Sequence, residues 1–147
     1  MTTMKAKVMN VVSAYKVLGD ARVKKLEESE VVKVIKARKA MRPIADDFDA
    51  FLKDCQEKFK PENWDEVQDK VAQWQKEGEN TTLTEAERVE LNKAIIGYQQ
   101  KVDGAVKDEL ARDVEISVEP LKEESATKML VENGWELKKL DEIEVIL

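Results

Sequence analysis

Five basic side chains crowd a short, highly charged segment. They are Lys33, Lys36, Arg38, Lys39 and Arg42. Arg and Lys pair well with phosphate oxygens, so this cluster is a candidate ligand-binding site for a nucleotide or for RNA. The alternative, which we favour from the sequence, is a solvated helix face that pairs with acids of a facing helix. The acids on that helix would be Glu85, Glu87 and Glu90.

The basic cluster contains no aromatic residue, which argues against base stacking on it. Trp64 and Trp74 form a second candidate site, for a protein partner, because tryptophan is enriched in interface hot spots. The other interpretation of this pair is packing of their helix onto the rest of the protein, and we favour it.

The sequence contains few residue patterns suited to catalysis or metal binding. Histidine is absent, and Cys55 is the single cysteine. His-based acid/base catalysis, cysteine clusters and intrachain disulfides are therefore excluded. Carboxylate runs such as Asp46, Asp47 and Asp49 have no second group predicted opposite them. We expect a non-enzymatic protein with no catalytic residues, no metal site and no cofactor.

The composition favours one helix-rich domain. The chain has 147 residues, of which 38% are charged, with only five Gly and three Pro. It has no apolar stretch that predicts a signal peptide or a membrane span. We therefore expect a cytoplasmic protein of a host cell or a virion-associated one, with no membrane partner.

Charge is unevenly distributed along the chain. Residues 1–50 carry 11 basic and 7 acidic groups, a net of +4, whereas residues 51–147 carry 14 basic and 24 acidic groups, a net of −10. The acidic excess of the whole chain argues against a nucleic-acid partner. Such a dipolar chain can pair its halves internally or stack on copies of itself.

Apolar spacing predicts four main helices. They cover residues 9–26, a heptad-like seam over 31–59 that includes Cys55, residues 62–77, and residues 84–111. Ser29 suits the start of the second helix, Pro43 predicts a kink or break within it, and Thr84-x-x-Glu87 is a capping box. Gly97 and Gly104 suggest either that another backbone passes close or that surface glycines are tolerated there.

In the C-terminal part the spacing of apolar residues changes from a helical period to alternation. Val114, Ile116 and Val118 alternate with polar residues, which predicts a half-buried strand. A short helix over 123–132, a turn at Asn133-Gly134 and a final strand over 143–147 follow. Because one strand alone is unstable, we expect the C-terminal segment or another chain to pair with residues 114–118.

These elements predict a mainly α fold with a minor β part. We expect a single domain, 1–147, built as a long antiparallel helical hairpin. An inserted amphipathic helix over 61–83 would lie at its tip, and 113–147 would form a small α/β cap. A two-helix hairpin buries only one face of each helix, so we expect self-association, as in a coiled coil, or a protein partner.

Three segments resemble known sequences. The first is Lys5–Leu18, which ends in Ala14-Tyr15-x-x-Leu18; the second is the charged helix around 31–59, with Phe48 and Leu52 as anchors. The third is the ending, Asp113 to Leu121 followed by Leu137-x-x-Leu140-x-x-Ile143.

Across residues 5–59 and 89–147 the chain resembles an uncharacterised family of small phage and prophage proteins. The segment 61–83 departs from that pattern. The resemblance implies a phage or prophage origin and a mostly helical fold, and it implies no activity.

The leading hypothesis is therefore a phage accessory protein that acts by binding, as a homo-oligomer. In one version it is an anti-defence protein that sequesters a host immune factor or an anionic signalling nucleotide. In the other it is a virion structural or assembly component that acts through helix–helix contacts with a phage protein.

Overall fold

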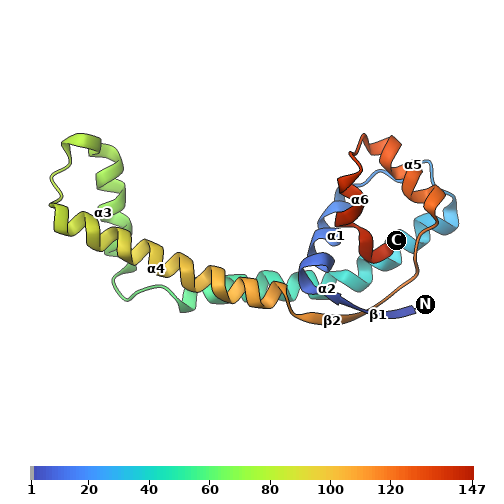
Figure 1. The fold of residues 1–147 in the computed structure, drawn as a ribbon, viewed down its shortest axis with the longest axis horizontal. Helices are drawn as coiled ribbons and strands as arrows, with labels where there is room; N and C mark the ends of the chain where they lie inside the picture. Colours follow the sequence, from blue (N-terminus) through green and yellow to red (C-terminus); the bar gives the residue numbers. More distant parts are fainter. Residues whose placement is uncertain (1) are drawn as a thin grey trace. The chain divides into compact units, whose positions relative to one another are not determined.

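The computed structural model describes residues 2–147 and shows a mainly α protein with a minor β part, as predicted (Figure 1). The α-helices are α1 (Val8–Asp20), α2 (Glu28–Lys58), α3 (Trp64–Glu77), α4 (Glu85–Leu110), α5 (Glu123–Asn133) and α6 (Lys138–Glu142). The strands are β1 (Thr2–Lys7) and β2 (Asp113–Val118), and two 3-10 turns are η1 (Gly78–Asn80) and η2 (Glu144–Ile146).

Internal contacts divide the chain into two compact units. Unit 1 comprises Met1–Ala50 and Asp108–Leu147, and unit 2 comprises Phe51–Lys107. The division falls within the two long helices, α2 and α4. Unit 2 therefore extends on both sides beyond the predicted insertion over 61–83.

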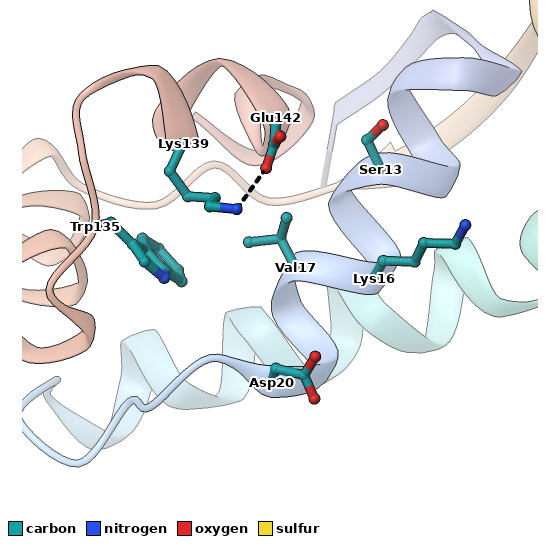
Figure 2. A pocket seen from close by; sticks show the side chains of 7 residues that line it. All are labelled: Ser13, Lys16, Val17, Asp20, Trp135, Lys139 and Glu142. Atoms are coloured by element: carbon teal, nitrogen blue, oxygen red, sulfur yellow. Dashed lines mark ion pairs between the residues drawn. The ribbon is translucent and has the colours of Figure 1, made fainter.

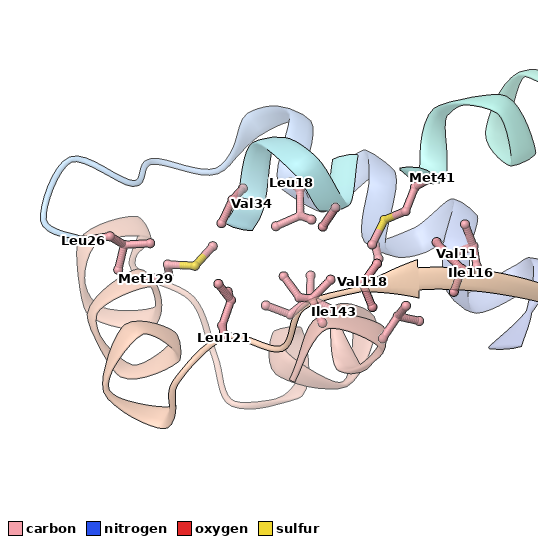
Figure 3. Packing of buried hydrophobic residues seen from close by; sticks show 14 residues of the cluster. Val11, Leu18, Leu26, Val34, Met41, Ile116, Val118, Leu121, Met129 and Ile143 are labelled. Atoms are coloured by element: carbon pink, nitrogen blue, oxygen red, sulfur yellow. The ribbon is translucent and has the colours of Figure 1, made fainter. Parts of the chain in front are cut away.

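Unit 1 holds the main hydrophobic core. Figure 3 shows side chains from α1, α2, β2 and the C-terminal segment meeting in one interior. Met41, Met129, Ile143 and Ile146 are completely buried there. The apolar side of α2 thus faces the C-terminal third of the chain, and its opposite side remains available to solvent.

The small sheet of unit 1 corrects one prediction. β2 forms where the alternating pattern predicted it, but its antiparallel partner is β1, with Thr3 opposite Ser117 and Lys7 opposite Asp113. The predicted pairing with residues 143–147 was wrong. That segment forms η2 instead, because Ile146 is buried in the core and its carbonyl accepts the Leu121 backbone N–H at 2.7 Å.

A buried carboxylate on α2 binds the start of α5. Glu30 is 1% exposed, and its carboxylate accepts the Lys122 backbone N–H at 2.8 Å and the Ser125 hydroxyl at 2.7 Å. Its other oxygen lies 2.7 Å from Lys33 Nζ. The bond from Lys33, with the two bonds from α5, lowers the pKa of Glu30 from 4.5 to about 2 despite its burial.

Unit 2 has a small core of its own between α3 and α4. Val67, Leu83 and Leu91 are buried in it. The predicted capping box is confirmed: the Glu87 backbone N–H donates to Thr84 Oγ1 at 3.1 Å, and the Thr84 N–H donates to the Glu87 carboxylate at 3.2 Å. These contacts fix where α4 begins.

The main differences from the predicted helices lie in α1 and α2. α1 ends at Asp20 rather than near residue 26, directly after Gly19. α2 begins at Glu28, so Ser29 lies inside its first turn rather than before it. α2 also continues through Pro43, so of the two predicted alternatives, a kink or a break, the break is wrong.

Two further predictions concern single residues. Cys55 is buried, as its position on the apolar seam predicted. A methyl group added at Gly97 or Gly104 would meet no heavy atom within 4 Å. Within residues 2–147 both positions have room for a side chain, which agrees with the second interpretation, tolerated surface glycines.

Candidate anion-binding site

A cleft of about 240 Å³ lies on unit 1 between α1 and the solvent-facing side of α2. Its position follows from the packing of α2: Val34, Ala37 and Met41 turn into the core, which leaves the residues between them on the outer faces. The side chains that line the cleft are Tyr15, Ile35, Arg38, Lys39 and Arg42.

Arg38 is the centre of this cleft, and packing holds it in place. Its guanidinium carbon lies 4.3 Å from the centroid of the Tyr15 ring, a cation–π contact. A Cβ added at Gly19 would lie 2.8 Å from Arg38 Nη2, so the absence of a side chain at Gly19 makes room for the guanidinium. Arg38 Nε is buried and has no hydrogen-bond partner within residues 2–147.

The cleft carries a strong positive charge. Its ionisable lining comprises the phenol of Tyr15 and the three cations Arg38, Lys39 and Arg42. In the part of the chain that the structure describes, no carboxylate lies within ion-pair distance of these cations. Ile35, which is 50% exposed, adds an apolar edge. Such a surface attracts an anion, and Arg in particular can bind phosphate oxygens in a bidentate manner.

The structure brings together three of the five predicted basic residues. Lys33 faces away from the cleft, with Nζ bonded to Glu30 at 2.7 Å and to the Pro120 carbonyl at 3.3 Å. The bond to Glu30 also raises the pKa of Lys33. Lys36 is exposed but does not line the cleft. Both residues therefore leave the candidate set that the geometry defines.

Two of the three acids predicted to neutralise the basic cluster have partners close by in the chain. Glu87 caps the start of its own helix, and Glu90 lies 3.9 Å from Lys93. Lys33 is neutralised by Glu30 of its own helix. Pairing of the basic cluster with these acids stays a prediction.

Tyr15 lines the candidate cleft but was not among the residues selected from the sequence. The segment from Lys33 to Arg42 contains no aromatic residue, but the fold places an aromatic ring from α1 directly against Arg38. The cluster itself lacks an aromatic, as predicted, but the cleft that it lines does not. Tyr15 lies 23 positions before Arg38 in the sequence, so only tertiary packing brings the two together.

The two tryptophans behave differently. The ring centroid of Trp64 lies 4.4 Å from that of Tyr98, whose hydroxyl donates to the Gln56 carbonyl at 3.0 Å. Trp74 also packs against the core of unit 2, and it lines an open groove of about 430 Å³ with Val71 and Ile95. Packing is thus observed for both, and Trp74 keeps a surface that a partner could contact.

Comparisons with known proteins add no functional assignment: no family model, curated protein or solved structure matches the chain. The resemblance to phage proteins stays a prediction. Within residues 2–147 no helix is long and apolar enough to cross a membrane. In the same residues no three His, Cys, Asp or Glu side chains lie so that they could hold a metal ion together.

Proposed function

We propose that this protein acts by binding, without catalysis, and that it captures a phosphate-bearing small molecule in the cleft of Tyr15, Arg38, Lys39 and Arg42. The observation that carries the proposal is the set of three cations without carboxylate partners around a guanidinium held on the Tyr15 ring. Such a guanidinium is already ordered, so little conformational entropy is lost when it binds an anion.

The biological role that fits this chemistry is the anti-defence one. A phage or prophage protein that sequesters an anionic signalling nucleotide needs a cationic cleft and no catalytic group. Sequestration of a host immune factor would use the same surface with an acidic protein segment. We place this activity in the cytoplasm of the host cell.

The test is a binding panel of linear mononucleotides, cyclic mononucleotides and cyclic dinucleotides, measured by isothermal titration calorimetry. We expect at least one to bind, and the Arg38→Gln/Arg42→Gln variant to bind at least about tenfold more weakly. Each lost bond to a charged group is worth about 1.5–3 kcal/mol, and 1.4 kcal/mol is a factor of ten.

The matched control is Lys24→Gln/Lys138→Gln, which removes two positive charges at exposed positions outside the cleft. It should bind like the unmutated protein. No binding across the panel would remove the nucleotide version. An equal loss in both double variants would mean that net charge, rather than the cleft, is responsible.

A second function is favoured by unit 2. The groove at Trp74, together with Val89 and Ile96 exposed on α4, offers apolar area for helix–helix contacts. This surface suits a virion structural or assembly component that self-associates or binds another phage protein. Presence of the protein in purified particles would support this role, and absence from both particles and assembly intermediates would exclude it.

A further inference from the structure

A second cleft in unit 1, of about 370 Å³, lies on a different face of α1 (Figure 2). Its lining residues are Ser13, Lys16, Val17 and Asp20 of α1, together with Trp135, Lys139 and Glu142 near the C-terminus. The α1 residues are spaced at i, i+3, i+4 and i+7, so they share one helical face. None of them lines the cleft around Arg38.

The ionisable groups of this cleft are balanced in charge. Lys139 and Glu142 already pair with each other at 3.1 Å (Figure 2). Lys16 and Asp20 are four residues apart on α1, yet they do not form an ion pair with each other. Within residues 2–147 neither has another ion-pair partner. One ammonium and one carboxylate on the α1 wall are thus without an ion-pair partner in the described residues, and in Figure 2 both side chains extend from α1 on the side away from Trp135.

The facing wall is aromatic. Trp135 follows Gly134, whose left-handed backbone (φ of 64°) ends α5, and its own N–H donates to the Leu130 carbonyl at 2.9 Å. The indole packs against the main core and also lines the cleft, with Val17 between the two walls in Figure 2. A ring fixed in this way offers a flat apolar surface to a ligand.

We propose that this cleft binds a small zwitterion of the amino-acid type with an aromatic or large apolar side chain. The ligand side chain packs on Trp135, and the exposed Lys16 and Asp20 side chains turn towards the cleft to pair with the ligand carboxylate and ammonium. The balanced charge disfavours a polyanion such as a nucleotide, which would meet two carboxylates. The volume is at the small end of the usual range of about 300–1,000 Å³ for ligand pockets.

Trp135 supplies the readout. The Trp64→Phe/Trp74→Phe variant leaves Trp135 as the sole tryptophan, because the chain has three. Its emission is recorded while phenylalanine, leucine, and their amide and N-acetyl derivatives are added. The amide lacks the carboxylate, and the N-acetyl derivative lacks the ammonium. We expect the free amino acids to shift the emission, and both derivatives to bind at least about tenfold more weakly.

Removing a charge from the protein should weaken binding as much as removing the opposite charge from the ligand. Lys16→Met should reduce binding of the free amino acid to the level of its amide, and Asp20→Asn should reduce it to the level of the N-acetyl derivative. Lys24→Met, at an exposed position outside the cleft, should leave binding unchanged. Far-UV circular dichroism checks that each variant is folded.

Two results would overturn the proposal. One is no shift in emission by any free amino acid up to about 10 mM, a concentration that detects even millimolar affinity. The other is equal binding of the free, amide and N-acetyl forms, which would mean that Lys16 and Asp20 do not recognise the ligand charges. Neither result bears on the cleft around Arg38, since the two clefts share no residue.

Discussion

At the scale of single residues, Glu30 shows how an ionised group is kept inside the core. It is charged because Lys33 and two donors at the start of α5 meet its carboxylate. Lys33 is only partly buried, so the cost of losing the carboxylate falls mainly on the bonds from the Lys122 N–H and the Ser125 hydroxyl. A bond to a charged group is worth about 1.5–3 kcal/mol. We expect Glu30→Gln to lower the free energy of unfolding by about 3 kcal/mol in urea denaturation at pH 7.

The pH dependence of stability should also change in this variant. The pKa of Glu30 falls from 4.5 in the unfolded chain to about 2 in the folded protein, so the folded state binds fewer protons between these values. Its contribution to stability is therefore complete above about pH 4.5 and is lost as the pH falls towards 2. The loss on acidification should be smaller in Glu30→Gln than in Glu28→Gln, an exposed neighbour. Equal acid sensitivity of the two variants would contradict this account.

A substitution at Gly19 should change binding without reducing stability. Alanine at this position would place its Cβ 2.8 Å from Arg38 Nη2, so the guanidinium must move away from Tyr15. The end of a flexible side chain can do so, and alanine is the better helix former by up to about 1 kcal/mol. We expect Gly19→Ala to melt at or above the temperature of the unmutated protein while nucleotide affinity falls. A variant that keeps full affinity would show that the position of Arg38 is unimportant.

At the scale of elements, local rules predicted much of the fold. The capping box at Thr84, the alternation over Val114–Val118 and the turn at Gly134 are each local patterns, and all three are found. The pairing of β2 with β1 was missed because the two strands are more than 100 residues apart in sequence. The partner of a strand depends on which distant segment packs beside it in the fold. The hydrophobic periodicity of the strand itself does not identify that partner.

Pro43 illustrates how tertiary packing overrides a local preference. The proline cannot donate to the carbonyl of Lys39, yet α2 continues because Met41 and Ala45 on either side are buried. We expect Pro43→Ala to raise the free energy of unfolding by about 1–2 kcal/mol, since proline is poor inside helices and stiffens the unfolded chain only slightly. Pro120→Ala, in the loop after β2, should give no such gain. A loss of stability in Pro43→Ala would mean that the proline has a specific role.

At the scale of the whole molecule, the sequence located the basic residues but not the site. Arg38, Lys39 and Arg42 were identified from their clustering in the sequence. Tyr15 lines the cleft from another helix, and Gly19 of that helix makes room for Arg38. The sequence pattern offered no reason to separate Lys33 from the other four basic residues of the cluster. Only the fold reveals its bond to Glu30. Charge patterns thus predict where anions are attracted, and packing determines which cations are free to bind them.

Native mass spectrometry tests the proposed anion capture most directly. The unmutated protein and the Arg38→Gln/Arg42→Gln variant would be purified from bacterial cells with an active phage-defence system and sprayed under non-denaturing conditions. We predict that the unmutated protein carries a phosphate-containing small molecule that is released under denaturing conditions, and that the variant does not. A bare unmutated protein, or the same bound molecule in both, would contradict capture by this cleft.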